Sequence, residues 1–219
     1  MRTLTKAVQD SISPYHALQL LQQGNDRFIN NLKFNRNLLQ QINETRDGQH
    51  PFAVILSCID SRTSAELIFD QGLGDIFSIR IAGNVLNEDI LGSMEFACKV
   101  AGAKIIVVLG HTKCGAIKGA CDHVEMGNLT GLLNKIKPAL HKTPVNGLDG
   151  YKYADKVAVS NVHHVMDEIP KYSPILHDMV ESDEIAIVGG MYDIETGLVE
   201  FFEHPDLIHK EKAVLESSF

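Results

Sequence analysis

The sequence predicts an α/β fold in which a central, mainly parallel sheet is flanked by helices. Three short apolar runs carry this prediction, because a continuous run suits a strand that is buried on both faces of a parallel sheet. Segments with helical spacing separate the runs, and this alternation is typical of βαβ units with right-handed crossovers. The chain has 219 residues, of which 44% are hydrophobic and 22% charged. It is therefore expected to form one domain with a substantial core.

Residues 1–48 are predicted to form an N-terminal helical arm. Ser13-Pro14 supplies an N-cap followed by proline at the first helical position. Apolar residues then recur at helical spacing over 17–32, and Gly24 is expected to divide this helix in two. The segment 35–49 is polar and is interpreted as a connection into the core.

The core begins with the apolar run 52–56, which is the first predicted strand. Thr63-x-x-Glu66 resembles a capping box that opens a helix ending near Phe69. The later elements continue the alternation. They are a strand over 76–82, a helix over 90–100, a strand over 104–109, a helix over 115–124, mostly helical structure over 128–182 with a break near 144–150, a strand over 184–189 and an edge strand over 198–202. The predicted core therefore spans 49–203, and 204–219 form a C-terminal tail.

Two clusters of chemically reactive residues follow the first and third apolar runs. Cys58 and His111 each lie about two residues beyond the carboxyl end of a predicted strand, where open α/β sheets form their sites. Cys114 falls near the start of a helix, whose dipole and free N–H groups favour thiolate over thiol. Two cysteines and one histidine would leave the fourth position of a zinc ion open, as a catalytic zinc requires. We therefore expect a zinc site that activates water.

Simpler interpretations of the same residues stay open. Buried thiols and histidines are common without a metal, and Cys58 and Cys114 are also compatible with a disulfide, although a reducing compartment disfavours it. Asp60 and Arg62 form either a surface ion pair or a pair that supports the metal ligands. Cys121 lies two helical turns, roughly 10 Å, beyond Cys114 and is expected to be a packing residue.

The net charge and the distribution of apolar residues argue against three classes of protein. The net charge of −8 argues against a nucleic-acid binder, which normally presents a basic face. No apolar run approaches the length of a membrane span, and the first residues lack the apolar core of a secretory signal. The expected location is the cytoplasm.

The chain resembles the β-class carbonic anhydrases over about residues 15–203. Four motifs carry the resemblance: Leu21-x-x-Gly24-Asn25-x-Arg27-Phe28, Cys58-x-Asp60-x-Arg62, His111-x-x-Cys114 and Gly189-Gly190-x-Tyr192-Asp193. The two central motifs are similar to the signature motifs of that family, and the first is similar to its N-terminal helical arm.

The resemblance implies one Zn²⁺ per chain, held by Cys58, His111 and Cys114, with water or hydroxide as the fourth ligand. It implies that Asp60, fixed by Arg62, accepts a hydrogen bond from this hydroxide. In a closed form of some members, the equivalent aspartate itself becomes a zinc ligand. The implied reaction is the reversible hydration of carbon dioxide to bicarbonate and a proton.

Finer matches favour the plant-like subgroup of this family. Gln49 matches its substrate-orienting glutamine, Phe77 matches a pocket phenylalanine, and backbone N–H groups near Gly115 are candidates to help bind substrate. The resemblance also implies a homodimer or a higher even-numbered oligomer, with each N-terminal arm packed on a neighbouring subunit. Two alternative functions stay open: carbon disulfide hydrolysis on the same scaffold, and non-catalytic binding of zinc or bicarbonate.

Overall fold

The computed structural model describes residues 3–145, 147–148, 150–204 and 207, and it confirms the predicted α/β architecture. The central sheet has five strands in the order β2-β1-β3-β4-β5. The strands are β1 (Ala53–Ser57), β2 (Ile76–Arg80), β3 (Ile105–His111), β4 (Ala186–Tyr192) and β5 (Val199–Phe201). Strands β1 to β4 are parallel, whereas β5 is antiparallel and forms one edge, as expected.

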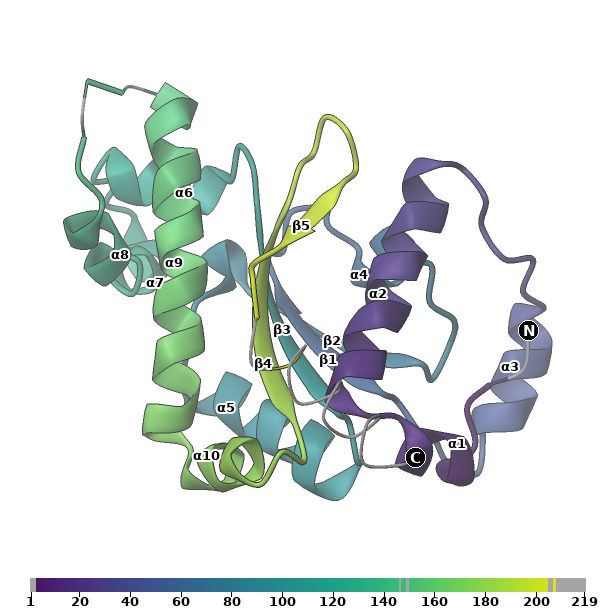
Figure 1. Cartoon of the computed structure of the whole chain (residues 1–219). Coiled ribbons are helices and arrows are strands. Elements are labelled where there is room, and N and C mark those ends of the chain that lie inside the picture. The colour runs from purple at the N-terminus through teal and green to yellow at the C-terminus, as the bar shows by residue number, and fades with distance from the viewer. Residues whose placement is uncertain (1–2, 146, 149, 205–206, 208–219) are drawn as a thin grey trace.

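Helices cover both faces of this sheet. In chain order they are α1 (Lys6–Ser11), α2 (Pro14–Ile29), α3 (Leu38–Thr45), α4 (Ala65–Ile68), the 3₁₀ turn η1 (Ala82–Asn84), α5 (Glu88–Glu95), the π-helical turn η2 (Phe96–Val100), α6 (Gly115–Cys121), α7 (Gly127–Asn134), α8 (Lys137–Lys142), α9 (Gly150–Tyr172) and α10 (Pro174–Glu181). Figure 1 shows α2 and α4 on one face and α9 and α10 on the other.

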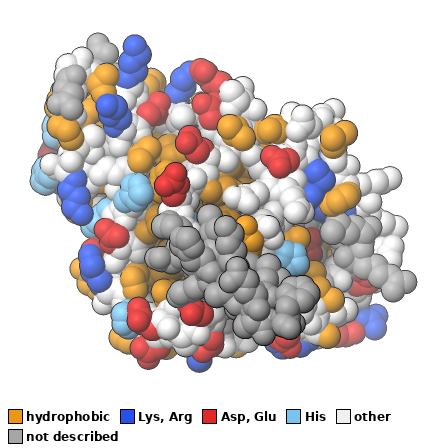
Figure 2. Space-filling view, in the orientation of Figure 1, with side chains coloured by type: hydrophobic (Ala, Val, Ile, Leu, Met, Phe, Trp, Pro, Cys, Tyr) orange, Lys and Arg blue, Asp and Glu red, His pale blue; other side chains and the backbone are white. Residues whose placement is uncertain are grey.

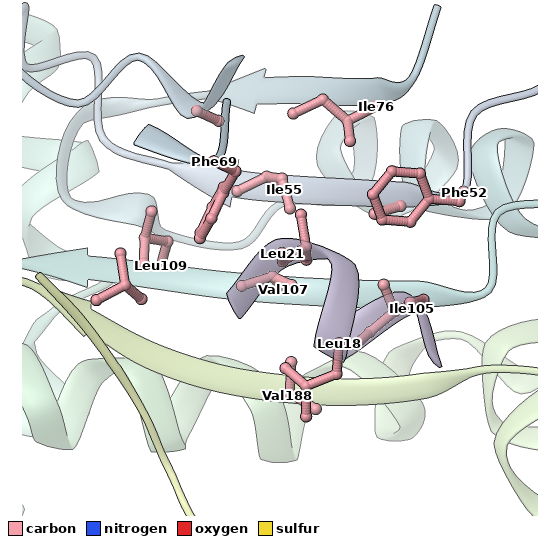
Figure 3. Packing of buried hydrophobic residues seen from close by; sticks show 14 of the residues in the cluster. Leu18, Leu21, Phe52, Ile55, Phe69, Ile76, Ile105, Val107, Leu109 and Val188 are labelled. Carbon is pink, nitrogen blue, oxygen red and sulfur yellow. The ribbon is translucent and has the colours of Figure 1, made fainter. Parts of the chain in front are cut away.

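The central strands are buried because successive side chains enter opposite apolar layers. Ile55 of β1 lies in the cluster that contains Leu21 of α2 and Val107 of β3 (Figure 3). Its neighbour Val54 lies in the other cluster, with Val162 of α9. Fully burying one such aliphatic side chain contributes about 1.5–3 kcal/mol, so both layers hold the strands in place.

The N-terminal arm differs from the prediction in two ways. Helix α2 runs through Gly24 without a break, and this glycine lets the helix approach the carbonyl oxygen of Phe69, which an added Cβ would strike. The segment 35–49, expected to be a connection, contains α3. Its N-cap is Asn37, whose side chain accepts a hydrogen bond from the N–H of Gln40 at 3.1 Å.

The predicted capping box of Thr63 and Glu66 is wrong. The Thr63 hydroxyl lies 3.0 Å from the carbonyl oxygen of Cys58 and 2.9 Å from that of Asp60, so it is committed to the preceding loop. Helix α4 begins one residue later than a cap at Thr63 would place it, after Ser64, whose side chain forms no capping hydrogen bond.

The surface shows no segregation of charge on the side that we can view. In Figure 2, lysine and arginine side chains are interspersed with aspartate and glutamate rather than gathered in one patch, in keeping with the net charge of −8. Within the described ranges, no helix has both the length and the apolar character needed to cross a membrane.

The close approach at Gly24 can be tested by substitution. We expect Gly24→Ala to lower the free energy of unfolding by about 1–3 kcal/mol, because the new methyl group must displace the backbone at Phe69. Gly92→Ala in α5 is the matched control, since its Cβ would meet nothing within 4 Å. Alanine there should be neutral or stabilise by about 0.5–1 kcal/mol. Denaturant titration of both variants measures the difference, and equal effects would contradict this account.

Candidate metal centre

The metal-ligand candidates meet at the carboxyl ends of two adjacent parallel strands. Strands β1 and β3 pair in a register that sets Ser57 beside Leu109. Cys58 directly follows β1, and His111 is the last residue of β3. The predicted position of His111 beyond its strand is therefore wrong, because β3 continues and pairs His111 with Tyr192 of β4.

The structure brings the three predicted ligands together. The sulfur, nitrogen and sulfur atoms of Cys58, His111 and Cys114 all lie within 4.8 Å of one another, and all three residues are buried. The two sulfur atoms are 3.9 Å apart. Cys58 and Cys114 are free thiols, as are Cys98 and Cys121. Two sulfurs bound at about 2.3 Å to a tetrahedral zinc would lie about 3.8 Å apart. The cysteine spacing therefore fits that ion without rearrangement.

The hydrogen bonding of His111 also fits a metal. Its Nδ1 lies 2.9 Å from the carbonyl oxygen of Thr112, and a carbonyl can only accept, so Nδ1 carries the proton. The opposite nitrogen, Nε2, is then unprotonated. It is buried and has no hydrogen-bond partner among the residues that the structure describes. Buried polar atoms nearly always have a bonding partner. A zinc ion held between Nε2 and the two cysteine sulfurs would be such a partner, because it would bind the lone pair of Nε2.

Cys114 is held at the start of a helix, as predicted. It is the N-cap of α6, and its side chain forms no capping hydrogen bond, although the nearby N–H groups of Ala116 and Ile117 favour its thiolate. The hydrogen bond from Cys114 lowers the pKa of Cys58 to about 4. The neighbouring Cys58 and burial raise the pKa of Cys114. One thiolate is thus already favoured, and a divalent cation would displace the remaining proton.

Asp60 and Arg62 form a two-pronged ion pair beside the cluster. Arg62 Nε lies 2.9 Å from Asp60 Oδ1, and Arg62 Nη2 lies 2.7 Å from Oδ2. The backbone N–H of Arg62 also donates to Oδ1 at 3.0 Å. These bonds from Arg62 hold the pKa of Asp60 well below its usual range, so the carboxylate is ionised near neutral pH. Asp60 lies outside the group of mutually close ligand atoms found among the described residues.

Two further side chains fix the loop that carries Asp60. Arg80 of β2 donates from Nε to the carbonyl oxygen of Cys58 at 3.1 Å and from Nη2 to that of Asp60 at 2.5 Å. Thr63 contacts the same two carbonyl oxygens. The role of Thr63 has no local sign in the sequence, because its spacing to Glu66 imitates a helix cap. A residue that completes a loop through tertiary contacts has no periodic pattern by which to find it.

The structure places the predicted substrate-binding residues at different distances from the cluster. Gly115 follows Cys114 at the start of α6, where an added Cβ would meet open space. Phe77 pairs with Val54, four positions before Cys58 along β1, which is about 13 Å at 3.3 Å per residue. Gln49 is exposed in the loop before β1 and lines an open hollow with Leu73 and Gly74. Within one chain, Gly115 lies beside the cluster of candidate ligands, whereas Phe77 and Gln49 lie away from it.

Comparisons with known proteins agree on one family. The sequence profile described as carbonic anhydrase matches residues 53–199. Carbonic anhydrase 2 of Mycobacterium tuberculosis is 33% identical over 207 residues, which cover 91% of this chain and 98% of that protein. The solved structure of the β-carbonic anhydrase CcaA has a TM-score of 0.70 and 25% identity, and covers 85% of this chain and 95% of that one. For the β-carbonic anhydrase CafA of Aspergillus fumigatus, the TM-score is 0.67 at 27% identity, with 80% and 86% covered.

The ligand set can be tested by metal analysis. We expect about one zinc per wild-type chain, and Cys58→Ser, His111→Ala and Cys114→Ser should each lose most of it, because each removes one of three ligands. Cys121→Ser is the control, since Cys121 is a free, half-buried thiol that packs against an apolar cluster. Elemental analysis of the folded proteins measures the ratio. A variant that retains a full equivalent of zinc would remove its residue from the ligand set.

Proposed function

This chain belongs to the β-class carbonic anhydrase family, and we propose that it hydrates carbon dioxide reversibly at a zinc ion held by Cys58, His111 and Cys114. The observation that carries this assignment of residues is the Nε2 atom of His111, which is buried beside two cysteine sulfurs and has no hydrogen-bond partner within the described part of the chain. A purely structural zinc site has four protein ligands. Among the described residues the group has three, which favours a site with a position open for water.

The zinc ion, when bound, lowers the pKa of a water molecule and so supplies hydroxide near neutral pH. Asp60 is ionised and can only accept a hydrogen bond. Its carboxylate would therefore accept a hydrogen bond from the attacking O–H group and so orient an oxygen lone pair toward the carbon of the substrate. Arg62 keeps this carboxylate charged and oriented through its two-pronged contact. Arg80 and Thr63 hold the backbone on which Asp60 sits.

We assign substrate contacts to Gln49, Phe77 and Gly115. Gln49 carries an amide N–H that can donate to a substrate oxygen, and backbone N–H groups near Gly115 can do the same. Phe77 packs edge-on against Phe96, with ring centroids 6.2 Å apart, and this apolar surface suits uncharged carbon dioxide. Because Gln49 and Phe77 lie far from Cys58 along their own chain, a second copy of the chain is the natural source of these two contacts.

Self-association is supported by the apolar surface of the N-terminal arm. The arm exposes large side chains that a single chain leaves in water: Leu32, Phe34, Leu38, Leu39 and Ile42. Several large exposed apolar side chains on one segment are typical of an interaction site. The path of the N-terminal arm is held by Asp70, which accepts hydrogen bonds from Arg27 Nε at 2.6 Å and from Arg36 Nη1 at 2.5 Å. We therefore propose a homodimer or a higher even-numbered oligomer in which the arm packs on its neighbour.

The partners proposed for the enzyme are carbon dioxide, bicarbonate and further copies of the chain. The free thiols of the described cysteines are in keeping with a cytoplasmic location. Carbon disulfide hydrolysis would use the same residues, and rate measurements with both substrates compare the two activities directly.

The role of Asp60 can be separated from metal binding. We expect Asp60→Asn to keep its zinc but to lower kcat/KM for carbon dioxide hydration by about 10²–10³-fold, the scale for removing one oriented polar group in an active site. Asp47→Asn is the control, because Asp47 pairs with Arg46 on the surface with both side chains largely exposed. Stopped-flow hydration assays and zinc analysis measure both quantities. An Asp60→Asn enzyme as fast as the Asp47→Asn enzyme would reduce the pair with Arg62 to a structural one.

The pH dependence follows from the charges at the site. Two thiolates offset the charge of a zinc ion, so the activated water should be less acidic than the pKa of about 7 typical of three-histidine sites. Activity should therefore rise with pH and stay modest near neutrality. Asp60 adds no further step between pH 5 and 9, because Arg62 lowers the pKa of its carboxyl well below that window. A profile of kcat/KM already saturated at pH 6.5 would contradict this prediction.

A further inference from the structure

The geometry points to Asn161 of α9 as a positioning residue that orients Gly83 so that its N–H donates to the sulfur of Cys58. This inference rests on the proposed function, since it concerns how the chain prepares one zinc ligand. It adds a residue on a helix that supplies no ligand itself. Three structural links connect the Asn161 side chain to the metal centre.

The first link is between Gly83 and the cysteine. The backbone N–H of Gly83, in η1, donates to Cys58 Sγ at 3.4 Å. Both residues are buried. An N–H dipole aimed at a thiolate stabilises its negative charge and fixes the direction of its lone pairs. It also limits how much charge the sulfur gives to a bound metal ion, which is one way in which outer contacts tune a metal site.

The second link is between Asn161 and Gly83. Asn161 Nδ2 donates to the carbonyl oxygen of Gly83 at 3.0 Å, and the asparagine is fully buried. The carbonyl and the N–H of Gly83 belong to the two peptide planes that meet at its Cα. Fixing the carbonyl therefore restricts the rotation that would turn the N–H away from Cys58.

This restraint matters because Gly83 has the freedom to move. Its φ is +69°, in the left-handed region that glycine adopts without strain. A side chain would be strained at this φ, and an added Cβ would lie 2.9 Å from Ile136 Cδ1. The position therefore favours glycine, and glycine alone does not hold one conformation. The hydrogen bond from Asn161 to the carbonyl oxygen of Gly83 restricts this conformational freedom.

The third link is the close seating of α9 on the sheet. Val162 is the next residue along α9, and its side chain packs against a glycine in each of the strands β3 and β4. An added Cβ at Gly110 of β3 would lie 2.7 Å from Val162 Cγ2, and one at Gly189 of β4 would lie 2.7 Å from Val162 Cγ1. These glycines let the helix approach closely enough for Asn161 to reach η1.

The composition of the buried face of α9 supports a specific role for Asn161. Its buried neighbours on that face are apolar: Ala154, Val157, Ala158, Val162, Val165 and Ile169. The Oδ1 atom of Asn161 is buried without a hydrogen-bond partner among the described residues, which is unfavourable. A packing role alone would be better served by an apolar side chain. The retained amide is therefore best explained by its bond to Gly83.

Two variants remove the donor in different ways. Asn161→Leu keeps roughly the size of the side chain, and Asn161→Asp keeps its shape while replacing the donor with an acceptor. We expect both to bind zinc about 10–100-fold more weakly in chelator competition, the range found for outer contacts of metal ligands. In the cobalt-substituted proteins, we expect the thiolate-to-cobalt charge-transfer band to shift relative to the wild type. A merely structural residue would not move this band.

Asn25 provides a matched control. It is also a buried asparagine, whose Nδ2 donates to the carbonyl oxygens of Ile68 and Gly197. Asn25→Leu and Asn25→Asp should therefore lose comparable stability but keep the zinc affinity and the cobalt spectrum of the wild type. Unchanged affinity and spectrum in the Asn161 variants, or equal changes in the Asn25 variants, would overturn the inference. Wild-type protein that binds no zinc would overturn the proposed function and this inference together, whereas zinc-loaded active enzyme with unaltered Asn161 variants overturns the inference alone.

A measurement on the wild-type protein covers the case in which the Asn161 variants do not fold. With cadmium-113 bound and the glycines labelled with nitrogen-15, the Gly83 amide should show a scalar coupling to the metal through the N–H···S hydrogen bond. The Gly83 amide should also exchange with solvent slowly, as a restrained donor does. A Gly83 amide that shows no coupling and exchanges freely would contradict the proposal.

Discussion

The parallel pairing of β1 with β3 is the constraint on which the rest of the site depends. Its register places the end of each strand at the same edge of the sheet, and Cys58 and His111 are thereby neighbours although they are far apart in the chain. Side chains alternate between the two faces of a strand, so a slip of one residue would turn every side chain of one strand to the opposite face. Such a slip would exchange Ile55 and Val54 between the two apolar layers, where each now packs with a different set of neighbours. Core packing therefore helps to hold the candidate metal ligands in place as well as the fold.

The same packing gives α9 a double role. Glycines at positions 110 and 189 bring this helix close to β3 and β4, which fills the second apolar layer. The close approach also carries the amide of Asn161 to η1 and, through Gly83, to Cys58. On the opposite face, Gly24 lets α2 approach the backbone after α4 in a comparable way. Small residues thus set the distance of a helix on each side of the sheet.

The sequence predicted the elements whose signal is local and missed those fixed by tertiary contacts. The buried strands were found because β1 and β3 are continuous apolar runs, and the family motifs identified Cys58, His111 and Cys114. The end of β3 was missed because Gly110 and His111 are not strand-like, although pairing with β4 keeps them in the sheet. Thr63 was misinterpreted because its spacing to Glu66 imitates a helix cap. Its hydroxyl instead forms hydrogen bonds with two carbonyl oxygens of the preceding loop. Asn161 has no local signal, since its partner is 78 residues away.

Solvent exposure increases from the candidate metal ligands to Arg62, and this arrangement suits the chemistry of the site. The three ligands are buried, the Asp60 side chain is 15% exposed and the Arg62 side chain is 50% exposed. Burial of the candidate ligands strengthens their electrostatic interaction with a cation. The Arg62 guanidinium is half exposed, so water also solvates its charge. A movement of Asp60 away from Arg62 would therefore break two side-chain hydrogen bonds without leaving the guanidinium both buried and unpaired.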